Sequence, residues 1–256
     1  MAKIVSIHSF RGGTGKSNVT ANVAAQVAQM GKRVGVIDTD IQSPGIHVLF
    51  GMEEDRMDKT LNDYLWGKCA IEETAYNVGD RVGGEKALHG GVIYLIPSSI
   101  RVGEITRILQ EGYNVGLLNN GFRALIQKLK LDYLFIDTHP GLNEETLLSI
   151  AISDVLLIIM RPDQQDFQGT AVTVDVARKL QVPNLFLVVN KALSSYNFDD
   201  LQKQVEKIYE SQVVAVLPLS EAVAGLQSAD LFSLRSPKHP FSKSIRDIAA
   251  AVEAAQ

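Results

Sequence analysis

A glycine-rich stretch near the N-terminus carries the clearest chemistry in the sequence. Residues 10–17 read Phe-Arg-Gly-Gly-Thr-Gly-Lys-Ser, between the apolar run Ile4–Ile7 and a helix-like segment, Asn18–Met30. Glycines let such a turn curl so that several backbone N–H groups point inward and form a nest for an anion, and the helix that follows adds partial positive charge. We therefore expect a loop that binds the phosphates of a nucleotide. Lys16 would reach the β- and γ-phosphates, and the Ser17 hydroxyl would bind Mg²⁺.

Carboxylates follow two further apolar segments. Asp38 and Asp40 come directly after Arg33–Ile37, and Asp137 follows Tyr133–Ile136. The carboxyl ends of parallel strands are where α/β sheets place their chemistry, and an Asp in such a position binds Mg²⁺ in many phosphate-loop enzymes. Alone, such an Asp would more often be a turn residue or a helix N-cap. Three carboxylates beside one phosphate loop would repel each other, and a magnesium nucleotide supplies the missing cation.

The remaining elements alternate between strand and helix patterns. This alternation predicts crossover units and one domain over residues 1–256, an α/β fold with a mostly parallel twisted sheet and helices on both faces. Residues 76–91 read as a glycine-bearing loop. We expect strands at 3–8, 33–37, 92–96, 131–136, 155–160, 185–189 and 213–217, and helices at 18–30, 60–66, 104–109, 122–129, 144–152, 170–180, 198–209 and 240–255.

Composition narrows the class of protein. The 256 residues are 46% apolar, enough for a sizeable core, and the net charge of −4 argues against a wholly basic nucleic-acid binder. The longest apolar run, Val155–Met160, is too short to span a bilayer, and Met1–Lys3 leads directly into a strand pattern rather than a secretory leader. The single cysteine, Cys69, allows no intrachain disulfide and fits a reducing cytoplasm.

With these motifs combined, the sequence resembles the ParA/MinD group of deviant P-loop ATPases, which position plasmids, chromosomes, division sites and other cargo. The general loop pattern has Gly where Phe10 stands, so this loop is a variant. Together the matching segments run from the N-terminus to about residue 220 and are far more specific than any one of them. They are Arg11–Ser17, Asp38–Asp40, Asp137–Gly141, Val188–Lys191 and Leu217–Leu219.

The resemblance implies a role for each matching residue. ATP would lie on the loop, Asp40 would orient the attacking water, and Asp38 and Asp137 would join Ser17 in the magnesium shell. Two subunits of this family sandwich two ATP molecules, so the ATP state would be a homodimer, with Asn143 and Glu144 near the dimer face. The residues implied to bind the nucleotide are Gly12, Gly13, Thr14, Gly15, Lys16, Ser17 and Asn18, with Asn190, Pro218 and Leu219 about the adenine.

Arg11 stands where the family has a lysine that reaches across to the partner's phosphates. Arginine keeps the positive charge and can grip phosphate with two N–H groups, but its planar fork is longer and differently aimed. Two interpretations stay open. Arg11 serves as the finger across the dimer, which we favour, or the loop binds ATP while hydrolysis and dimerisation use another cation.

Two features near motifs of the family have competing interpretations. His139 replaces a proline that many relatives carry, and we expect a turn residue rather than a ligand. Near the C-terminus, where ParA-like members bind DNA without sequence preference, basic residues form a local cluster that is either a DNA surface or a solvated face. Its members are Arg235, Lys238, Lys243 and Arg246, with His239 beside them.

The tail at 240–255 turns into an alanine-rich segment without a bulky apolar face. We therefore expect core packing rather than the membrane attachment of MinD-like members.

These expectations combine into a magnesium-dependent ATPase, cytoplasmic and associated with the nucleoid, whose ATP dimer binds nonspecific DNA and whose hydrolysis an adaptor protein stimulates. The cargo would be a plasmid or a cytoplasmic assembly, with a slight preference for an assembly such as the carboxysome. The alternatives are a nucleotide-dependent enzyme, an iron–sulfur cluster carrier, a regulator that hydrolyses nothing, and a membrane-associated relative. Cluster carriers need paired cysteines, which a chain with Cys69 alone lacks.

Overall fold

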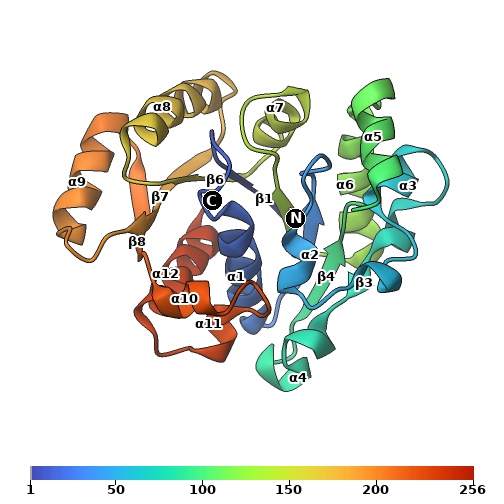
Figure 1. The fold of residues 1–256 in the computed structure, drawn as a ribbon, viewed down its shortest axis with the longest axis horizontal. Coiled ribbons are helices and arrows are strands. Elements are labelled where there is room, and N and C mark those ends of the chain that lie inside the picture. Colours follow the sequence, from blue (N-terminus) through green and yellow to red (C-terminus); the bar gives the residue numbers. More distant parts are fainter. Residues whose placement is uncertain (1) are drawn as a thin grey trace.

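An eight-stranded sheet forms the centre of the molecule, with helices packed on both faces (Figure 1). The computed structural model describes residues 2–256, with only the backbone of residues 84 and 85. The strand order is β3-β4-β2-β5-β1-β6-β7-β8, and every neighbouring pair is parallel except β3 and β4. The strands are β1 (Lys3–His8), β2 (Arg33–Asp38), β3 (Tyr76–Asn77), β4 (Val92–Ile96), β5 (Tyr133–Asp137), β6 (Val155–Met160), β7 (Asn184–Ala192) and β8 (Gln212–Pro218).

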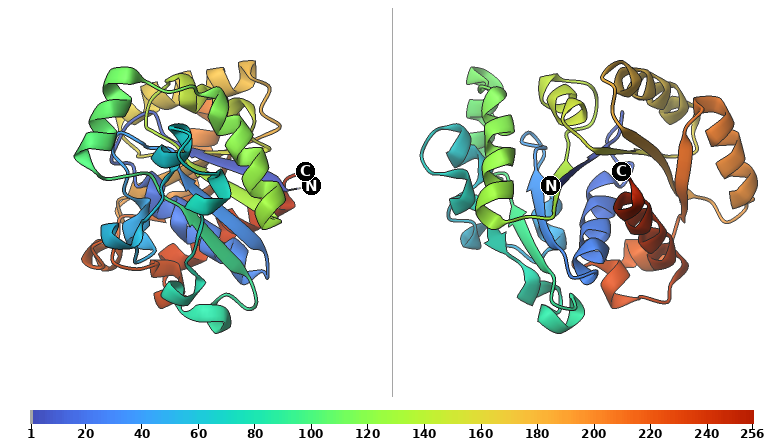
Figure 2. Two further views of the ribbon diagram at one scale, coloured as in Figure 1. Left: turned by 90° about the vertical axis from the view of Figure 1, so that its right-hand side faces the viewer. Right: turned by 180° about the vertical axis from the view of Figure 1, so that it is seen from behind.

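The helices divide between the two faces. On one face α1 and α12 cover the middle of the sheet, with α2, α10 and α11 beside them; on the other lie α3 and α5 to α9 (Figures 1 and 2). The helices are α1 (Lys16–Gln29), α2 (Ile46–Leu49), α3 (Leu61–Leu65), α4 (Gly84–Ala87), α5 (Val102–Glu111), α6 (Gly116–Leu129), α7 (Glu144–Ala151), α8 (Gln164–Lys179), α9 (Phe198–Tyr209), α10 (Glu221–Gly225), α11 (Phe232–Arg235) and α12 (Pro240–Ala254). Three short 3₁₀ turns complete them: η1 (Glu54–Arg56), η2 (Ile71–Thr74) and η3 (Gly79–Val82).

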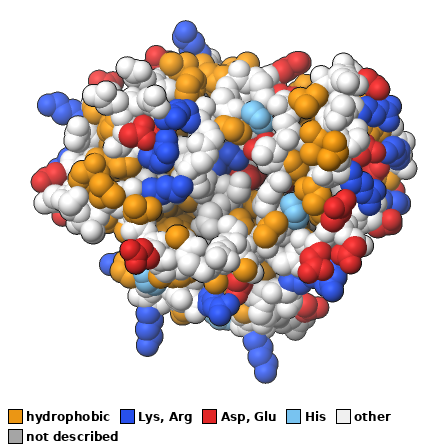
Figure 3. All heavy atoms as spheres, viewed as in Figure 1, with side chains coloured by type: hydrophobic (Ala, Val, Ile, Leu, Met, Phe, Trp, Pro, Cys, Tyr) orange, Lys and Arg blue, Asp and Glu red, His pale blue; other side chains and the backbone are white. Residues whose placement is uncertain are grey.

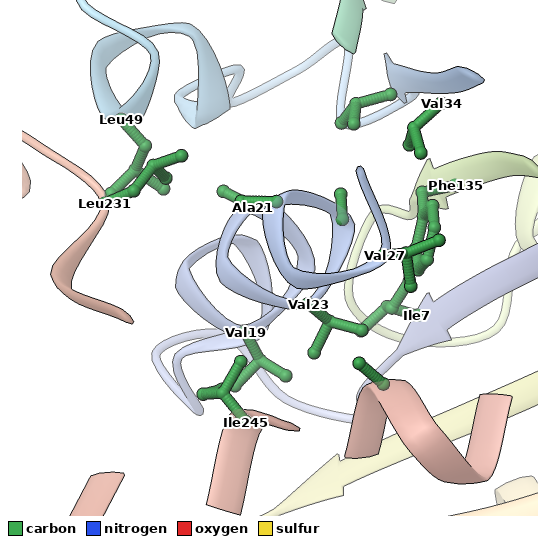
Figure 4. Close-up of a cluster of buried hydrophobic side chains, with 14 of the residues drawn as sticks. Ile7, Val19, Ala21, Val23, Val27, Val34, Leu49, Phe135, Leu231 and Ile245 are labelled. Carbon is green, nitrogen blue, oxygen red and sulfur yellow. The ribbon is translucent and has the colours of Figure 1, made fainter. Parts of the chain in front are cut away.

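Helix α1 is surrounded by apolar side chains, as Figure 4 shows. Val19, Val23 and Val27 recur every four residues and are fully buried, because α1 lies between the sheet and α12. The predicted core face of α12 is also buried, which confirms that this helix packs in the core. Met30, the last residue of the helix predicted at 18–30, is 38% exposed, since α1 ends before it.

The positions of the strand ends determine where chemistry can occur. β1 has β5 on one side and β6 on the other, so the chain order reverses there, and ligands of open α/β sheets bind at such a reversal. Asp38 and Asp137 are direct partners in the register of β2 and β5. Parallel pairing therefore brings two carboxylates separated by 99 residues side by side, next to the end of β1.

Several predicted boundaries were wrong. Helix α8 begins at Gln164 rather than at residue 170, because the Asp163 side chain caps it by accepting from the Asp166 N–H at 3.0 Å. Residues 76–91 contain β3, η3 and α4 where the glycines suggested only a loop. Strand β2 ends at Asp38, one residue later than predicted, and Asp40 lies beyond it.

The start of β1 and the end of α12 lie side by side (Figure 2). The Lys3 ammonium donates to the carbonyl oxygen of Ala255 at 2.6 Å and to that of Val252 at 3.0 Å. These bonds fix the last turn of α12 to the first strand, on the side of the sheet away from the carboxyl ends of its parallel strands.

Candidate functional site

The predicted phosphate loop connects β1 to α1 at the reversal point of the sheet. Gly13 and Gly15 have φ angles of 76° and 91°, in the left-handed region that favours glycine. Gly15 directly precedes Lys16, the first residue of α1, so the loop ends where the positive end of the helix dipole begins. The backbone from Gly12 to Ser17 lines a cavity of about 300 Å³, with Asn18 and Asp40 on its walls. The loop thus has the form that the sequence predicted.

Two side chains from the end of β7 support the loop. The Asn190 amide donates to the carbonyl oxygen of Thr14 at 2.7 Å, and the Lys191 ammonium donates to that of Gly13 at the same distance. A Cβ on Gly15 would lie 2.4 Å from the Asn190 amide nitrogen, so the loop and β7 fit together only with glycine there. We predicted Asn190 beside an adenine and gave Lys191 no role. The sequence signal for a role of Lys191 was its position next to Asn190, in a segment that matches the family.

Lys16 lies at the centre of a buried polar cluster. Its ammonium is 2.9 Å from Oδ1 of Asp137, and the Thr20 hydroxyl donates to the same oxygen at 3.1 Å. The other carboxylate oxygen of Asp137, Oδ2, is buried and has no hydrogen-bond partner within the described residues. A free carboxylate oxygen beside a phosphate loop suits a magnesium-bound water, so these residues fit the predicted metal. Lys16 contacts Asp137 here, within the cavity where the phosphates were predicted.

The two aspartates after β2 have different environments. Asp38 is fully buried, and it accepts from the Asp40 N–H at 3.0 Å and from the Gly45 N–H at 3.2 Å. Burial, and next the nearby Asp137 charge, raise the pKa of Asp38 well above its usual range. Burial also raises the pKa of Asp40, and nearby Lys16 opposes that rise. A cation at this point would stabilise both carboxylates, in agreement with the predicted magnesium site.

A second cavity adjoins the first. It has a volume of about 280 Å³ and shares Gly15, Asn18 and Ser228 with the cavity of the phosphate loop. One cavity is rich in backbone N–H groups, and the other has apolar walls as well as polar ones. Together they suit the phosphates and the base of one nucleotide. Residues predicted about the adenine line the second cavity: Asn190, Pro218 and Leu219.

Arg11 is held by acids of its own chain. Its guanidinium lies 3.3 Å from Oδ1 of Asp166 and 3.7 Å from Oδ1 of Asp163, at the start of α8, and its side chain is 38% exposed. Arg161 shares both acids, at 3.1 Å from each. Residues 161–166 follow the end of β6 and include all three of these partners, Arg161, Asp163 and Asp166. Asp163 and Asp166 form an acid clamp that holds Arg11, the variant residue of the loop.

Phe10, which replaces the usual glycine, packs on the same helix. A Cβ on Gly169 would lie 2.1 Å from a ring carbon of Phe10, so the ring rests directly on the backbone of α8. The variant loop is thus attached to α8 by an aromatic contact and by the ion pairs of Arg11. The absence of a side chain at residue 169 was the only sequence signal for this contact.

The basic cluster near the C-terminus is exposed but not continuous. Arg235 lies 3.5 Å from Asp230, and Arg246 donates to the carbonyl oxygen of Pro237 at 2.7 Å. Lys238 and Lys243 are also exposed, while His239 caps α12 by accepting from the Phe241 N–H. In Figure 3 lysine and arginine side chains project from the lower edge of the molecule, on the side of α11 and α4 in Figure 1.

Metal clusters and membrane-spanning helices are absent from the described residues, which are 2–256 without the side chains of 84 and 85. In that range no group of three or more His, Cys, Asp or Glu side chains could hold a metal ion, so a cation at the loop would depend on phosphate oxygens as well. No helix among those residues is long and apolar enough to cross a membrane. Cys69 is partly exposed, and burial raises the pKa of its thiol.

A sheet that reverses at β1, a phosphate loop ending in Lys16 and three converging aspartates define a P-loop nucleotide-binding protein. Residues 2–195 match the AAA domain family, and the chain belongs to this family as an ATP-binding P-loop ATPase. An ATP-binding protein of unknown role from Methanocaldococcus jannaschii is 28% identical over 254 residues, which cover 98% of this chain and 87% of the relative.

An iron–sulfur cluster carrier protein from the same organism is 31% identical over 196 residues, covering 74% of this chain and 61% of the relative. This chain thus spans about three fifths of the carrier's length.

Solved structures share the fold across the whole chain. The cell-division ATPase MinD of Pyrococcus furiosus has a TM-score of 0.81 at 22% identity, with 99% of each chain covered. A ParA family ATPase of Chlorobium tepidum has a TM-score of 0.77 at 18% identity, covering 98% of this chain and 99% of its own. The apo form of McdA from Cyanthece has a TM-score of 0.74 at 18% identity, covering 99% of this chain and 100% of its own. These likenesses establish the fold.

Proposed function

We propose that this ATPase alternates between a monomer and an ATP-bound dimer, and that the dimer binds DNA without sequence preference and positions an intracellular cargo. An adaptor protein would stimulate hydrolysis and so release the dimer from DNA. The observation that carries the proposal is Arg11, a cation at the position of the family's signature lysine, at the edge of a site built for a nucleotide. The fold shared with MinD, ParA and McdA structures supports it.

Each residue of the site has a task in this proposal. The loop backbone and Lys16 bind the phosphates, and Lys16 exchanges its contact with Asp137 for one with the nucleotide. Ser17, Asp38 and Asp137 would hold Mg²⁺, which would stabilise the negative charge that develops on the phosphates. Asp40, on the wall of the phosphate cavity, orients the attacking water. Leu219, 53% exposed, would be covered in part by the base.

Arg11 has a separate task. In the described chain its guanidinium is paired with Asp166 and Asp163, so a role across the dimer requires that it leave these acids. A partner's phosphate group carries more negative charge than one carboxylate and accepts two guanidinium N–H groups at once, which favours the exchange. The acids would then hold Arg11 in the monomer, and the partner's nucleotide would hold it in the dimer.

Substitution of Arg11 tests this proposal. The Arg11→Ala variant should lose most ATPase activity and the ATP-dependent doubling of mass in mass photometry, while it still binds ATP. Arg161→Ala is the matched control, because Arg161 also pairs with Asp163 and Asp166 but lies outside the loop. Unchanged activity and unchanged dimer mass in Arg11→Ala would remove Arg11 from the mechanism.

DNA binding is the second testable part. The four exposed basic residues of the C-terminal cluster would contact phosphates, so retention on nonspecific DNA should require ATP and fall steeply as salt rises. Replacing all four by glutamine should abolish retention, whereas the same change at Lys203 and Lys207 of α9, which are equally exposed, should not. Retention that ignores salt would contradict a phosphate-binding surface. The replaced residues are Arg235, Lys238, Lys243 and Arg246.

The relatives named as iron–sulfur cluster carriers make cluster transfer a second candidate function. The cysteine content of this chain argues against it. Clusters are usually held by four thiolates, and two chains with Cys69 alone supply only two. Incubation with iron and sulfide under anaerobic conditions should therefore leave no bound iron after gel filtration. Stoichiometric iron and sulfide in the protein peak would favour the carrier function instead.

A measurement of ATP turnover separates the remaining alternatives. A regulator that hydrolyses nothing would show binding without turnover, with or without DNA. A biosynthetic enzyme would need a second substrate for turnover, and a membrane-associated relative would respond to lipid vesicles rather than to DNA. For the proposed function we expect slow basal turnover that rises in the presence of DNA and adaptor.

A further inference from the structure

His139 lies beside the carboxylate that faces the phosphate cavity. It occupies the turn after β5, and its Nε2 is 3.8 Å from Oδ1 of Asp40. Its other ring nitrogen, Nδ1, is 2.6 Å from the carbonyl oxygen of Pro140. A carbonyl oxygen only accepts hydrogen bonds, so Nδ1 carries a proton. Nε2 is then the ring nitrogen left to accept a hydrogen bond, and it lies on the side of Asp40.

The distance between these two acceptors matters. A direct hydrogen bond to oxygen spans about 2.7–3.2 Å, so Nε2 and the Asp40 carboxylate are not bonded to each other. A water that donates one hydrogen to each of two acceptors holds them roughly 4 Å apart, which is close to the observed separation. Asp40 lines the cavity of the phosphate loop, and His139 lines a separate small cavity of about 10 Å³ that Thr39 and Ile41, the two neighbours of Asp40, also line. A water between the two acceptors therefore lies where Asp40 separates the two cavities.

We propose that His139 and Asp40 together hold the water that attacks the nucleotide, with Nε2 of His139 as the second acceptor. This inference rests on the proposed role of Asp40 in ATP hydrolysis. A water that donates both hydrogens has its lone pairs directed away from its two acceptors and toward the phosphate. A lone Asp40 leaves the water free to rotate about a single hydrogen bond, whereas two acceptors fix its orientation.

The chemical step is hydrolysis of the terminal phosphate. The water oxygen forms a bond to the γ-phosphorus while the bond from that phosphorus to the β–γ bridging oxygen breaks, and ADP leaves with the electron pair. One water proton passes to the Asp40 carboxylate, and the other stays on the phosphate product. His139 positions the water and takes no proton in this step.

Two substitutions of similar polarity separate the ring nitrogens. In His139→Gln the longer side chain puts its amide near the position of Nε2. In His139→Asn the shorter side chain puts its amide near the position of Nδ1 only. We expect His139→Gln to keep at least about a third of the wild-type kcat. His139→Asn should lose about 10- to 100-fold in kcat with KM for ATP unchanged, the size of loss that misplacement by one ångström causes. Equal kcat in the two variants, or a change in KM alone, would overturn the inference.

A double-mutant cycle gives a readout that a structural role would not move. If both residues hold one water, Asp40→Asn with His139→Asn should be no slower in single turnover than Asp40→Asn alone. Losses that multiply would show that His139 acts independently of Asp40. If the wild-type protein hydrolyses no ATP, or Asp40→Asn keeps full activity, the proposed function fails instead. Thermal unfolding and ATP affinity of each variant show that its site is folded.

Discussion

At the scale of single residues, some buried polar atoms of the site have hydrogen-bond partners and others have none. Asp38 has backbone donors on both oxygens, while one oxygen of Asp137 and one ring nitrogen of His8 are buried without a partner in the described residues. Buried polar atoms without partners destabilise a fold unless a ligand or ion satisfies them. Because these atoms lie near the phosphate loop, we infer that the fold is less stable there without nucleotide and that binding supplies the missing partners.

The Lys16–Asp137 pair should stabilise the protein without nucleotide. Both side chains are less than one tenth exposed, and removing one partner of a buried pair costs about 3–5 kcal/mol. We expect Lys16→Ala to lower the free energy of unfolding by about 3 kcal/mol in urea at neutral pH. Thr20→Ala, which removes the other donor to the same oxygen, should cost only about 1 kcal/mol. Equal losses in the two variants would argue against the ion pair.

His8 should make stability depend on pH. Burial, and next the nearby Lys16 charge, lower the pKa of His8 from 6.5 to about 3. Below about pH 6.5 His8 therefore binds a proton in the unfolded chain but not in the folded chain. The free energy of unfolding is at its full value above that pH and falls as the solution becomes more acidic. Each pH unit in that window costs about 1.4 kcal/mol.

Replacement of His8 isolates this contribution. His8→Asn keeps a donor toward the Thr138 hydroxyl, which lies 2.8 Å from Nδ1, but does not titrate. Between pH 6.5 and pH 5 the wild-type protein should lose about 2 kcal/mol more unfolding free energy than the variant. Parallel curves for the two proteins would show that His8 titrates normally.

At the scale of elements, the loop and β7 must be considered together. The spacing of glycines predicted the loop, because glycine allows left-handed backbone conformations that other residues avoid, and this property can be read locally. Its attachment to β7 and α8 could not be predicted, since Asn190, Lys191 and Gly169 are distant in sequence and owe their positions to the order of the strands. Short elements such as β3 and α4 were missed because four residues or fewer carry no clear periodicity.

Two glycines of the loop provide a matched pair of substitutions. Alanine at Gly13 meets nothing within 4 Å, and alanine at Gly15 collides with the Asn190 amide, although both positions have positive φ. Both variants should lose roughly 1 kcal/mol of stability to the left-handed backbone. Only Gly15→Ala should also weaken ATP binding by tenfold or more in a titration with a fluorescent nucleotide. Equal affinities would show that the fit to Asn190 does not matter.

At the scale of the whole molecule, the patterns of residues predicted the parallel sheet, whereas the homodimer was implied by the family resemblance alone and stays a prediction. Buried apolar runs and polar strand ends follow from chain chemistry alone, and the register of β2 and β5 then places Asp38 beside Asp137. An association between two chains depends on surface geometry, which a pattern of residues does not specify. The acid clamp on Arg11 was hidden for the same reason.

The clamp should oppose dimerisation. Asp166→Asn weakens the contact at 3.3 Å, so ATP should produce dimers at a protein concentration at least about threefold lower than in the wild type. Asp163→Asn is the control, since asparagine also caps helices well and the distance to Arg11 is longer, at 3.7 Å. Mass photometry across a dilution series gives both values. Weaker dimerisation in Asp166→Asn would mean that the acid supports the dimer rather than competing with it.

The packing of Phe10 on Gly169 has a mechanical consequence. A loop that shifts on closing around a nucleotide pushes or pulls the first turns of α8, because the ring has no space to slide past that backbone. Helix α8 runs along the exterior, where Val172 is 47% exposed. Nucleotide binding in the cavity of the phosphate loop would thereby change the position of the exposed face of α8. A second protein that binds this face could respond to the nucleotide without contacting it.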